Sequence, residues 1–212
     1  MRNPIDLSVY LVLDANLCKT PQKMVEVALE AVNAGATVVQ LRAPEWKKRR
    51  LLEAARLLKT NLQGRVPLII NDHLDVALLS GAEGVHLGQD DISVDDARAV
   101  LGDKDIIGLS AGNLQELPEK ETTVDYLGVG PVFATATKKD AGSAIGIEGL
   151  LEVIQNTDLP IVAIGGIHAG NAPSVMQAHT DGIAVVSAIC ASPHPAQATQ
   201  ELVEIVSKAK YQ

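Results

Sequence analysis

Eight short apolar runs recur along this chain, and they constrain its fold more than any other feature. Each run is rich in Val, Ile and Leu, and longer mixed segments separate one run from the next. Buried parallel strands have this continuous apolar character because helices cover both faces of their sheet. The predicted strands are Val9–Leu13, Val38–Leu41, Leu68–Ile70, Val85–Leu87, Ile106–Leu109, Tyr126–Val129, Ile161–Ile164 and Ile183–Val186.

The segments between the runs have the apolar periodicity and the end signals of helices. Before the first of them, Thr20 and Pro21 are typical of an N-cap and a first-turn proline, and Gly35 follows its last periodic residue. Strands that alternate with helices predict a parallel sheet with right-handed crossovers. The predicted helices are Gln22–Asn33, Trp46–Leu62, Leu74–Ser80, Val94–Leu101, Leu114–Lys120, Ile147–Asn156, Ala172–Ala178 and Ala196–Lys208.

This alternation fits two α/β architectures, an open doubly wound sheet and a closed barrel. An open sheet usually has fewer strands, and its first turn favours a glycine-rich fingerprint, which Leu13-Asp14-Ala15-Asn16 lacks. We therefore expect an α/β fold with a single (β/α)8 TIM barrel as one domain over residues 1–212. The active site of such a barrel lies at the carboxyl ends of its strands.

The composition narrows the classes of partner. A net charge of -8 and an aromatic content of 2% argue against nucleic acid, which needs a basic field and stacking platforms. No apolar stretch approaches the length of a membrane span, and no secretory signal is recognisable, so we expect a cytoplasmic protein that does not bind membranes. Cys18 and Cys190 lack metal-type spacing and are expected to be free thiols.

Small residues follow the last two runs. Gly165 and Gly166 come directly after the seventh, and Ser187 comes directly after Val186 at the end of the eighth. In barrels, the loops after these two strands often bind phosphate through backbone N–H groups. Glycine lets an anion approach the backbone closely, although a tight turn with positive φ would need glycine as well. We interpret both loops as a phosphate site.

Charged residues follow the earlier runs. Asp72 and Asp91 come after the third and fourth predicted strands, where their oxygen atoms suit Mg²⁺. A helix cap for Asp72 and a loop turn for Asp91 are the alternatives. Arg42 and Lys138 are the basic groups expected at the mouth, with Lys138 in the polar segment 130–146, a candidate lid. His86 is expected to be a hydrogen-bonded structural histidine.

Several of these strings resemble motifs of the thiamine phosphate synthase family, in order and over almost the whole chain. The most specific are His86-Leu87-Gly88-Gln89-Asp90-Asp91 and Thr135-Ala136-Thr137-Lys138-Lys139. The resemblance implies an Mg²⁺-dependent transferase, often homodimeric, that joins hydroxymethylpyrimidine diphosphate to thiazole phosphate, giving thiamine phosphate and diphosphate. Diphosphate leaves first in this family, so its site must stabilise charge and align two partners.

The resemblance also implies a role for each matching residue. Asp72 and Asp91 would hold Mg²⁺, and Arg42, Ser110 and Lys138 would be the catalytic groups. Arg42, Asn71 and Lys138 would hold the diphosphate, and Gln40 and Ser110 would orient the pyrimidine. The thiazole phosphate would be bound by Thr135, Thr137, Gly166, Val186 and Ser187.

Two departures from the family pattern leave other functions open. Pro44 stands where the family typically has a diphosphate-binding lysine, and Gly112 stands where it often has a histidine. Lys47 or Lys48 could replace the lost charge. The alternatives are a thiazole tautomerase-like enzyme, which would need a histidine as acid and base, a non-catalytic regulatory barrel that binds phosphate ligands, and a sugar-phosphate isomerase or epimerase.

Overall fold

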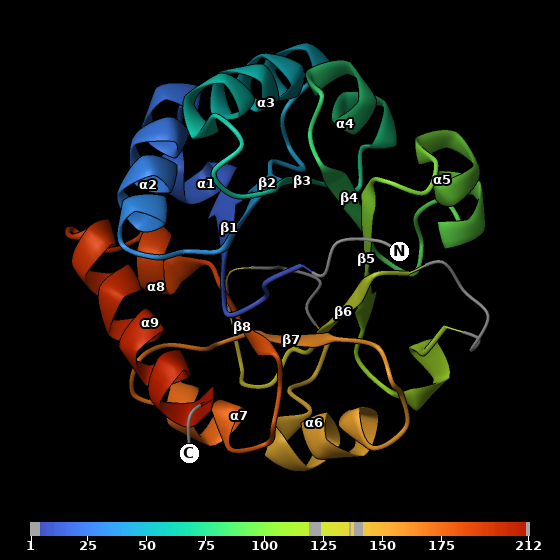
Figure 1. Cartoon of the computed structure of the whole chain (residues 1–212), viewed down its shortest axis with the longest axis vertical. Coiled ribbons are helices and arrows are strands. Elements are labelled where there is room, and N and C mark those ends of the chain that lie inside the picture. The colour runs from blue at the N-terminus through green and yellow to red at the C-terminus, as the bar shows by residue number, and fades with distance from the viewer. Residues whose placement is uncertain (1–4, 119–123, 136, 138–141, 211–212) are drawn as a thin grey trace.

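Eight parallel strands form a closed barrel in chain order, and β8 pairs with β1 to complete it. This computed structural model of the chain describes residues 5–118, 124–135, 137 and 142–210. Figure 1 looks along the barrel, with the strands as an inner ring and the helices around them. The architecture confirms the (β/α)8 TIM barrel predicted from the alternation of apolar runs and helices.

The observed strands lie within one or two residues of the predicted ones at each end. Val186 is predicted to end the last strand, but that strand ends at Val185. Val186 is instead the residue before a short helix. The strands are β1 (Val9–Asp14), β2 (Val38–Arg42), β3 (Leu68–Asn71), β4 (Gly84–Leu87), β5 (Ile106–Ala111), β6 (Tyr126–Val129), β7 (Ile161–Ile164) and β8 (Gly182–Val185).

Most helices begin and end where the capping signals predict. The Thr20 side chain accepts a hydrogen bond from the Lys23 N–H and caps the first long helix. Two helices of four residues were not predicted, because one turn is too short to show periodicity. The helices are α1 (Ala15–Cys18), α2 (Pro21–Asn33), α3 (Lys48–Leu62), α4 (Leu74–Ser80), α5 (Val94–Leu101), α6 (Gly146–Ile154), α7 (Ala172–Met176), α8 (Ser187–Cys190) and α9 (Pro195–Lys210).

The helix predicted over Leu114–Lys120 is wrong. Only a 3-10 turn, Leu114–Glu116, forms there. Leu117 has an extended backbone, with φ -67° and ψ 135°, as expected for the residue before Pro118. Residues 119–120 lie outside the part of the chain that the structure describes.

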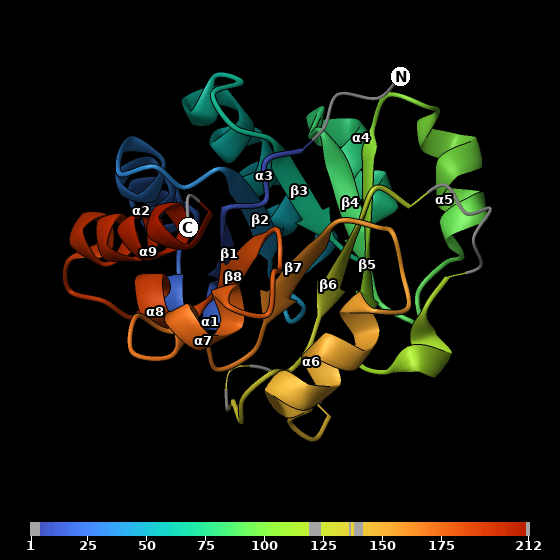
Figure 2. The same ribbon diagram turned by 60° about the horizontal axis from the view of Figure 1, so that its bottom comes forward.

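Side chains from alternate strand positions point to opposite sides of the barrel wall. Leu11 and Leu13 of β1 belong to the large core between the strands and the helices, whereas Tyr10 and Val12 belong to a smaller core inside the barrel. Figure 2 shows α9 lying beside α2 outside β1 and β8, so the last helix completes the outer ring. Because Tyr10 and Tyr126 both belong to the smaller core, their hydroxyls need hydrogen-bond partners inside the barrel.

The cysteines and the lengths of the helices bear on two further predictions. Cys18 and Cys190 are free thiols, as predicted. Among the described helices, none combines the length and the apolar character that crossing a bilayer would require.

Candidate active site

A cavity of about 560 Å³ opens at the carboxyl ends of the strands. Every strand, or the loop that follows it, contributes to its lining. A wider hollow adjoins the cavity and shares Arg42, Asn71 and Ser110 with it. The cavity is lined by the predicted residues Gln40, Arg42, Asn71, Ser110, Thr135, Thr137, Gly165, Gly166, Val186 and Ser187, and the hollow by Asp72 and Asp91. Lys138 lies outside the described residues.

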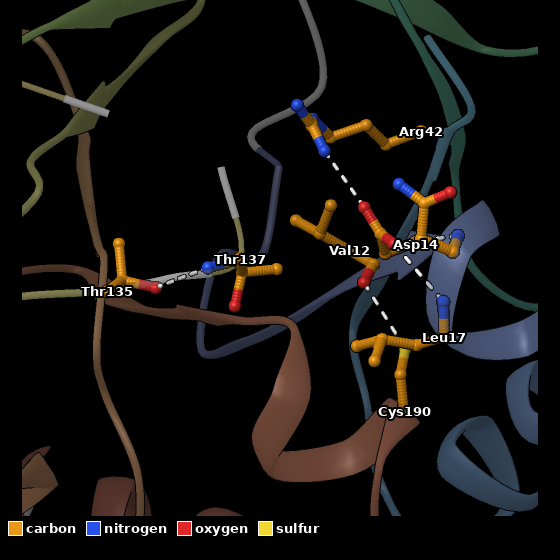
Figure 3. Close-up of polar contacts among 8 residues, drawn as sticks. Val12, Asp14, Leu17, Arg42, Thr135, Thr137 and Cys190 are labelled. Carbon is orange, nitrogen blue, oxygen red and sulfur yellow. Dashed lines mark hydrogen bonds and ion pairs between the residues drawn. The ribbon is translucent and has the colours of Figure 1, made fainter. Parts of the chain in front are cut away.

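Arg42 and Asp14 form an ion pair at the mouth of the barrel. The Arg42 Nη1 atom donates to Asp14 Oδ2 over 2.8 Å, and Figure 3 shows the two side chains pointing toward each other. Parallel pairing of β1 with β2 brings Asp14 and Arg42 to the same level. Asp14 Oδ1 accepts from the N–H groups of Asn16 and Leu17, so the same carboxylate caps α1. Our sequence reasoning missed Asp14, although its place directly after an apolar run is a signal.

Five polar side chains form one hydrogen-bonded network inside the barrel. Gln40 Nε2 donates to the Tyr10 hydroxyl over 2.9 Å, and the hydroxyls of Tyr10 and Tyr126 lie 2.7 Å apart. His86 Nδ1 lies 2.9 Å from the Tyr126 hydroxyl, and His86 Nε2 lies 2.9 Å from Ser110 Oγ. We call Gln40, Tyr10, Tyr126, His86 and Ser110 the polar network. It links the two residues predicted to orient the pyrimidine.

The sequence predicted only part of this network. His86 is the hydrogen-bonded histidine that was expected, and it lines the cavity as well. Tyr10 and Tyr126 lie within apolar runs, so the sequence identifies them only as strand residues. Burial raises the pKa of Tyr10 and raises that of Tyr126 well above its usual value. Both phenols therefore keep their protons at neutral pH and remain hydrogen-bond donors.

The glycine pair after β7 forms a tight turn. Gly165 has φ +100° and Gly166 has φ +64°, in the region that favours glycine. A Cβ at Gly165 would lie 2.5 Å from the Cα of Pro131, and one at Gly166 would lie 2.8 Å from the Cβ of Phe133. The turn therefore requires glycine for its own geometry, and its phosphate-binding role stays a prediction.

The two predicted metal carboxylates lie on the rim of the hollow. Asp72 has φ +62°, and its N–H donates to the His86 carbonyl over 2.9 Å. The N-cap alternative for Asp72 is wrong, because His73 is the N-cap residue of α4. Asp91 takes part in a loop turn, since its Oδ2 accepts from the Gly88 N–H over 2.7 Å, and its metal-binding role stays a prediction.

Two carboxylates on one hollow suit Mg²⁺ better than a metal that needs a complete protein cage. Among the described residues, no group of three His, Cys, Asp or Glu side chains could hold a metal ion. Mg²⁺ usually takes one or two carboxylates and completes its shell with water and substrate phosphates. Asp72 and Asp91 meet that requirement, and they share the hollow with Arg42.

Neither Lys47 nor Lys48 lies at the rim beside Pro44. Pro44 and Glu45 line the hollow, whereas neither Lys47 nor Lys48 lines it or the cavity within the described part of the chain. Lys48 Nζ lies 2.6 Å from Asp75 Oδ2 at an exposed position. The structure therefore gives no support to the idea that these lysines replace the lost charge.

The chain is similar to known proteins over almost its whole length. The model of the family described as thiamine monophosphate synthase matches residues 9–189. The chain is 51% identical to a thiamine-phosphate synthase of Azorhizobium caulinodans, over 99% of this chain and 100% of that relative. It is 43% identical to the thiamine-phosphate synthase of Archaeoglobus fulgidus, over 96% of this chain and 95% of that one.

Solved structures agree with these matches. A thiamine phosphate pyrophosphorylase from Pyrococcus furiosus superposes with a TM-score of 0.86 at 36% identity, covering 97% of this chain and 98% of that one. A 3-hexulose-6-phosphate synthase from Salmonella typhimurium, with a TM-score of 0.73 at 16% identity over 96% of this chain and 100% of that one, shares the fold alone. The chain belongs to the thiamine monophosphate synthase family.

Proposed function

We propose that this protein is a thiamine-phosphate synthase, a transferase that joins hydroxymethylpyrimidine diphosphate to thiazole phosphate and releases diphosphate. The observation that carries the proposal is the meeting of both predicted substrate sites in one cavity. Gln40 and Ser110, proposed for the pyrimidine, and Gly166 and Ser187, proposed for the thiazole phosphate, all line it. Its volume of about 560 Å³ is in the usual range for small-molecule sites.

The diphosphate end of the site is built around Arg42 and Asn71. Arg42 offers a planar fork of N–H donors that suits phosphate oxygens, and its pairing with Asp14 limits the positions that the guanidinium can adopt. Charge that develops on the leaving diphosphate would be stabilised by these groups without reorganisation. Lys138, from the loop outside the described residues, would add a second positive charge.

Asp72 and Asp91 would hold Mg²⁺ at the rim beside Arg42. Bound there, the ion would neutralise negative charge on the diphosphate. The unusual φ of Asp72 supports this role, because strained backbone at a non-glycine residue is often retained at functional sites.

Gln40 and Ser110 would orient the pyrimidine ring from inside the barrel, and the turn at Gly165 and Gly166 would bind the thiazole phosphate. Val186, Ser187, Thr135 and Thr137 would complete the phosphate site. Holding both partners in one enclosed volume replaces a bimolecular encounter with an aligned pair.

The rival functions have weaker support. A tautomerase-like enzyme needs a histidine that is available as acid and base, whereas both ring nitrogens of the cavity-lining His86 lie within hydrogen-bonding distance of Tyr126 and Ser110. An isomerase or epimerase would need a proton-abstracting group. Besides the two carboxylates proposed for Mg²⁺, the mouth includes Asp14, which pairs with Arg42, and Glu116, which accepts from the Gly112 N–H over 2.7 Å. A regulatory barrel would bind the same ligands without converting them.

A turnover assay distinguishes these functions. The purified protein is mixed with Mg²⁺ and both substrates, and thiamine phosphate is measured with and without a chelator. We expect product that disappears with chelator and in Asp91→Ala, while the matched variant Asp95→Ala, at an exposed position on α5, keeps full activity. Binding of Mn²⁺ in the presence of diphosphate, followed by electron paramagnetic resonance, should also weaken in Asp91→Ala.

Absence of product together with intact binding of thiazole phosphate would contradict the proposal and favour the regulatory barrel. Product that forms without a divalent metal would contradict the Mg²⁺ assignment. The homodimer, the cytoplasmic location and the closing of segment 130–146 stay predictions.

A further inference from the structure

We propose that Tyr10, Tyr126 and His86 are positioning residues that set which hydrogen-bonding groups Gln40 and Ser110 present to the pyrimidine. This inference rests on the proposed function and deepens it. The polar network would thereby select an aminopyrimidine over the corresponding oxopyrimidine. Each member of the network has a fixed number of protons to donate.

The donor in each hydrogen bond of the network determines the donor in the next. Gln40 Nε2 is a donor only, so Tyr10 accepts from it and has one proton left for Tyr126. Tyr126 in turn has one proton for His86 Nδ1. A neutral imidazole then has its proton on Nε2, where it donates to Ser110 Oγ. The Ser110 proton is left to point into the cavity.

The two ends of the network therefore present matched groups. Gln40 keeps its carbonyl Oε1 as an acceptor, and Ser110 keeps its hydroxyl proton as a donor; both residues line the cavity. If donor and acceptor were exchanged at one end alone, two donors or two acceptors would face each other inside the barrel. Such a mismatch is costly in a buried site, so the direction set by the Gln40 amide at one end fixes the direction at the Ser110 end.

An aminopyrimidine matches this pattern. Its exocyclic amino group donates, and its unprotonated ring nitrogen accepts. An oxopyrimidine has a carbonyl in place of the amino group and a proton on the adjacent ring nitrogen. The carbonyl of that ligand would face Gln40 Oε1, which is also an acceptor, and repulsion would weaken its binding.

The packing around the network shows that the barrel makes space for these rings. A Cβ at Gly108 would overlap with the Tyr126 ring and with His86 Nδ1, and a Cβ at Gly128 would lie 2.9 Å from His86 Cε1. The centroids of the His86 and Tyr126 rings lie 5.5 Å apart, and those of Tyr10 and Tyr126 lie 5.9 Å apart. Glycines on β5 and β6 thus hold the network in one arrangement.

The test compares two pyrimidine diphosphates that differ only in the amino or oxo group. Their affinities for the unmodified protein, Tyr126→Phe and Tyr10→Phe are measured by calorimetry. Each substitution keeps the ring and removes one hydroxyl, which disconnects Gln40 from Ser110. We expect the amino-over-oxo affinity ratio to fall about tenfold in both variants, the worth of one hydrogen bond, with affinity for thiazole phosphate unchanged.

The matched control is Thr199→Val, which removes a buried hydroxyl that donates to the Pro195 carbonyl in α9, outside the cavity lining. The control should leave the affinity ratio as it is in the unmodified protein. An unchanged ratio in both tyrosine variants would overturn the inference, as would equal binding of the two pyrimidines by the unmodified protein. Affinity is measured without turnover, so failure of the synthase activity would be recognised separately in the product assay.

Discussion

One carboxylate, that of Asp14, both pairs with Arg42 over 2.8 Å and caps α1. Its two oxygen atoms have different partners: Oδ2 accepts from the guanidinium, and Oδ1 accepts from the Asn16 and Leu17 N–H groups. The side chain of Asp14 is only 2% exposed, so its charge has little water around it. The position of the proposed diphosphate-binding arginine is therefore tied to the start of the barrel's first helix.

Asp14→Asn should separate these two tasks, because an asparagine oxygen can still cap α1 while the charge that holds Arg42 is lost. We expect kcat/KM for the pyrimidine diphosphate to fall about tenfold, the effect of losing one charge-assisted hydrogen bond. Steady-state kinetics would measure this change, and the thiazole phosphate KM should stay constant. Asp158→Asn, at an exposed position, is the control. Tighter binding of the diphosphate would contradict a positioning role for Asp14.

Pro44→Lys should strengthen binding of the pyrimidine diphosphate. Pro44 lines the hollow beside Arg42, so a lysine there would add a positive charge near the proposed diphosphate site. We expect KM for this substrate to fall several-fold at low salt and the gain to shrink as salt screens the charge. Pro44→Ala controls for removal of the proline ring. If Pro44→Lys and Pro44→Ala behaved alike at every salt concentration, the diphosphate would lie elsewhere.

Arg98→Ala should destabilise the fold strongly without involving the cavity. Arg98 Nη2 lies 2.6 Å from Asp125 Oδ2, with the two side chains 7% and 13% exposed. Removing one partner of a buried pair leaves the other charge uncompensated, so we expect the free energy of unfolding to fall by about 3–5 kcal/mol. Urea denaturation would measure the loss. Lys48→Ala, which breaks an exposed pair with Asp75, should cost far less, and equal losses would contradict this account.

Alkaline pH should destabilise the protein through Tyr10 and Tyr126. Burial raises the folded-state pKa of both phenols above their ordinary value of 10.0. Below pH 10 both phenols are protonated in either state, so they add no pH dependence. Above pH 10 the unfolded chain loses these protons first, and stability falls by up to about 1.4 kcal/mol per pH unit for each phenol.

Urea denaturation between pH 9 and pH 11 would test this titration. Tyr10→Phe and Tyr126→Phe should each show a shallower decline than the unmodified protein. The comparison between variants removes the contribution of lysines and cysteines, which titrate in the same range. Equal slopes in all three proteins would show that the buried phenols are not responsible.

Most of the architecture could be predicted from the sequence. Parallel strands buried on both faces need continuous apolar runs, so β6 and β7 were located to the residue. Their carboxyl ends share one face, which is why polar residues such as Asn71 and Ser110 could be assigned to a common mouth. Local signals failed for α1 and α8, which are too short to show periodicity, whereas Pro118 is a local signal against the helix predicted over Leu114–Lys120.

The hydrogen bonds inside the barrel depended on its closure. Tyr10 and Tyr126 are 116 positions apart and lie within apolar runs, so nothing local marks their hydroxyls as partners. The pairing of Asp14 with Arg42 likewise depends on the register of β1 against β2. Apolar periodicity is a property of neighbouring residues and can be recognised along the chain. The partner of a buried polar group is set by strand register and barrel closure, which only the tertiary structure decides.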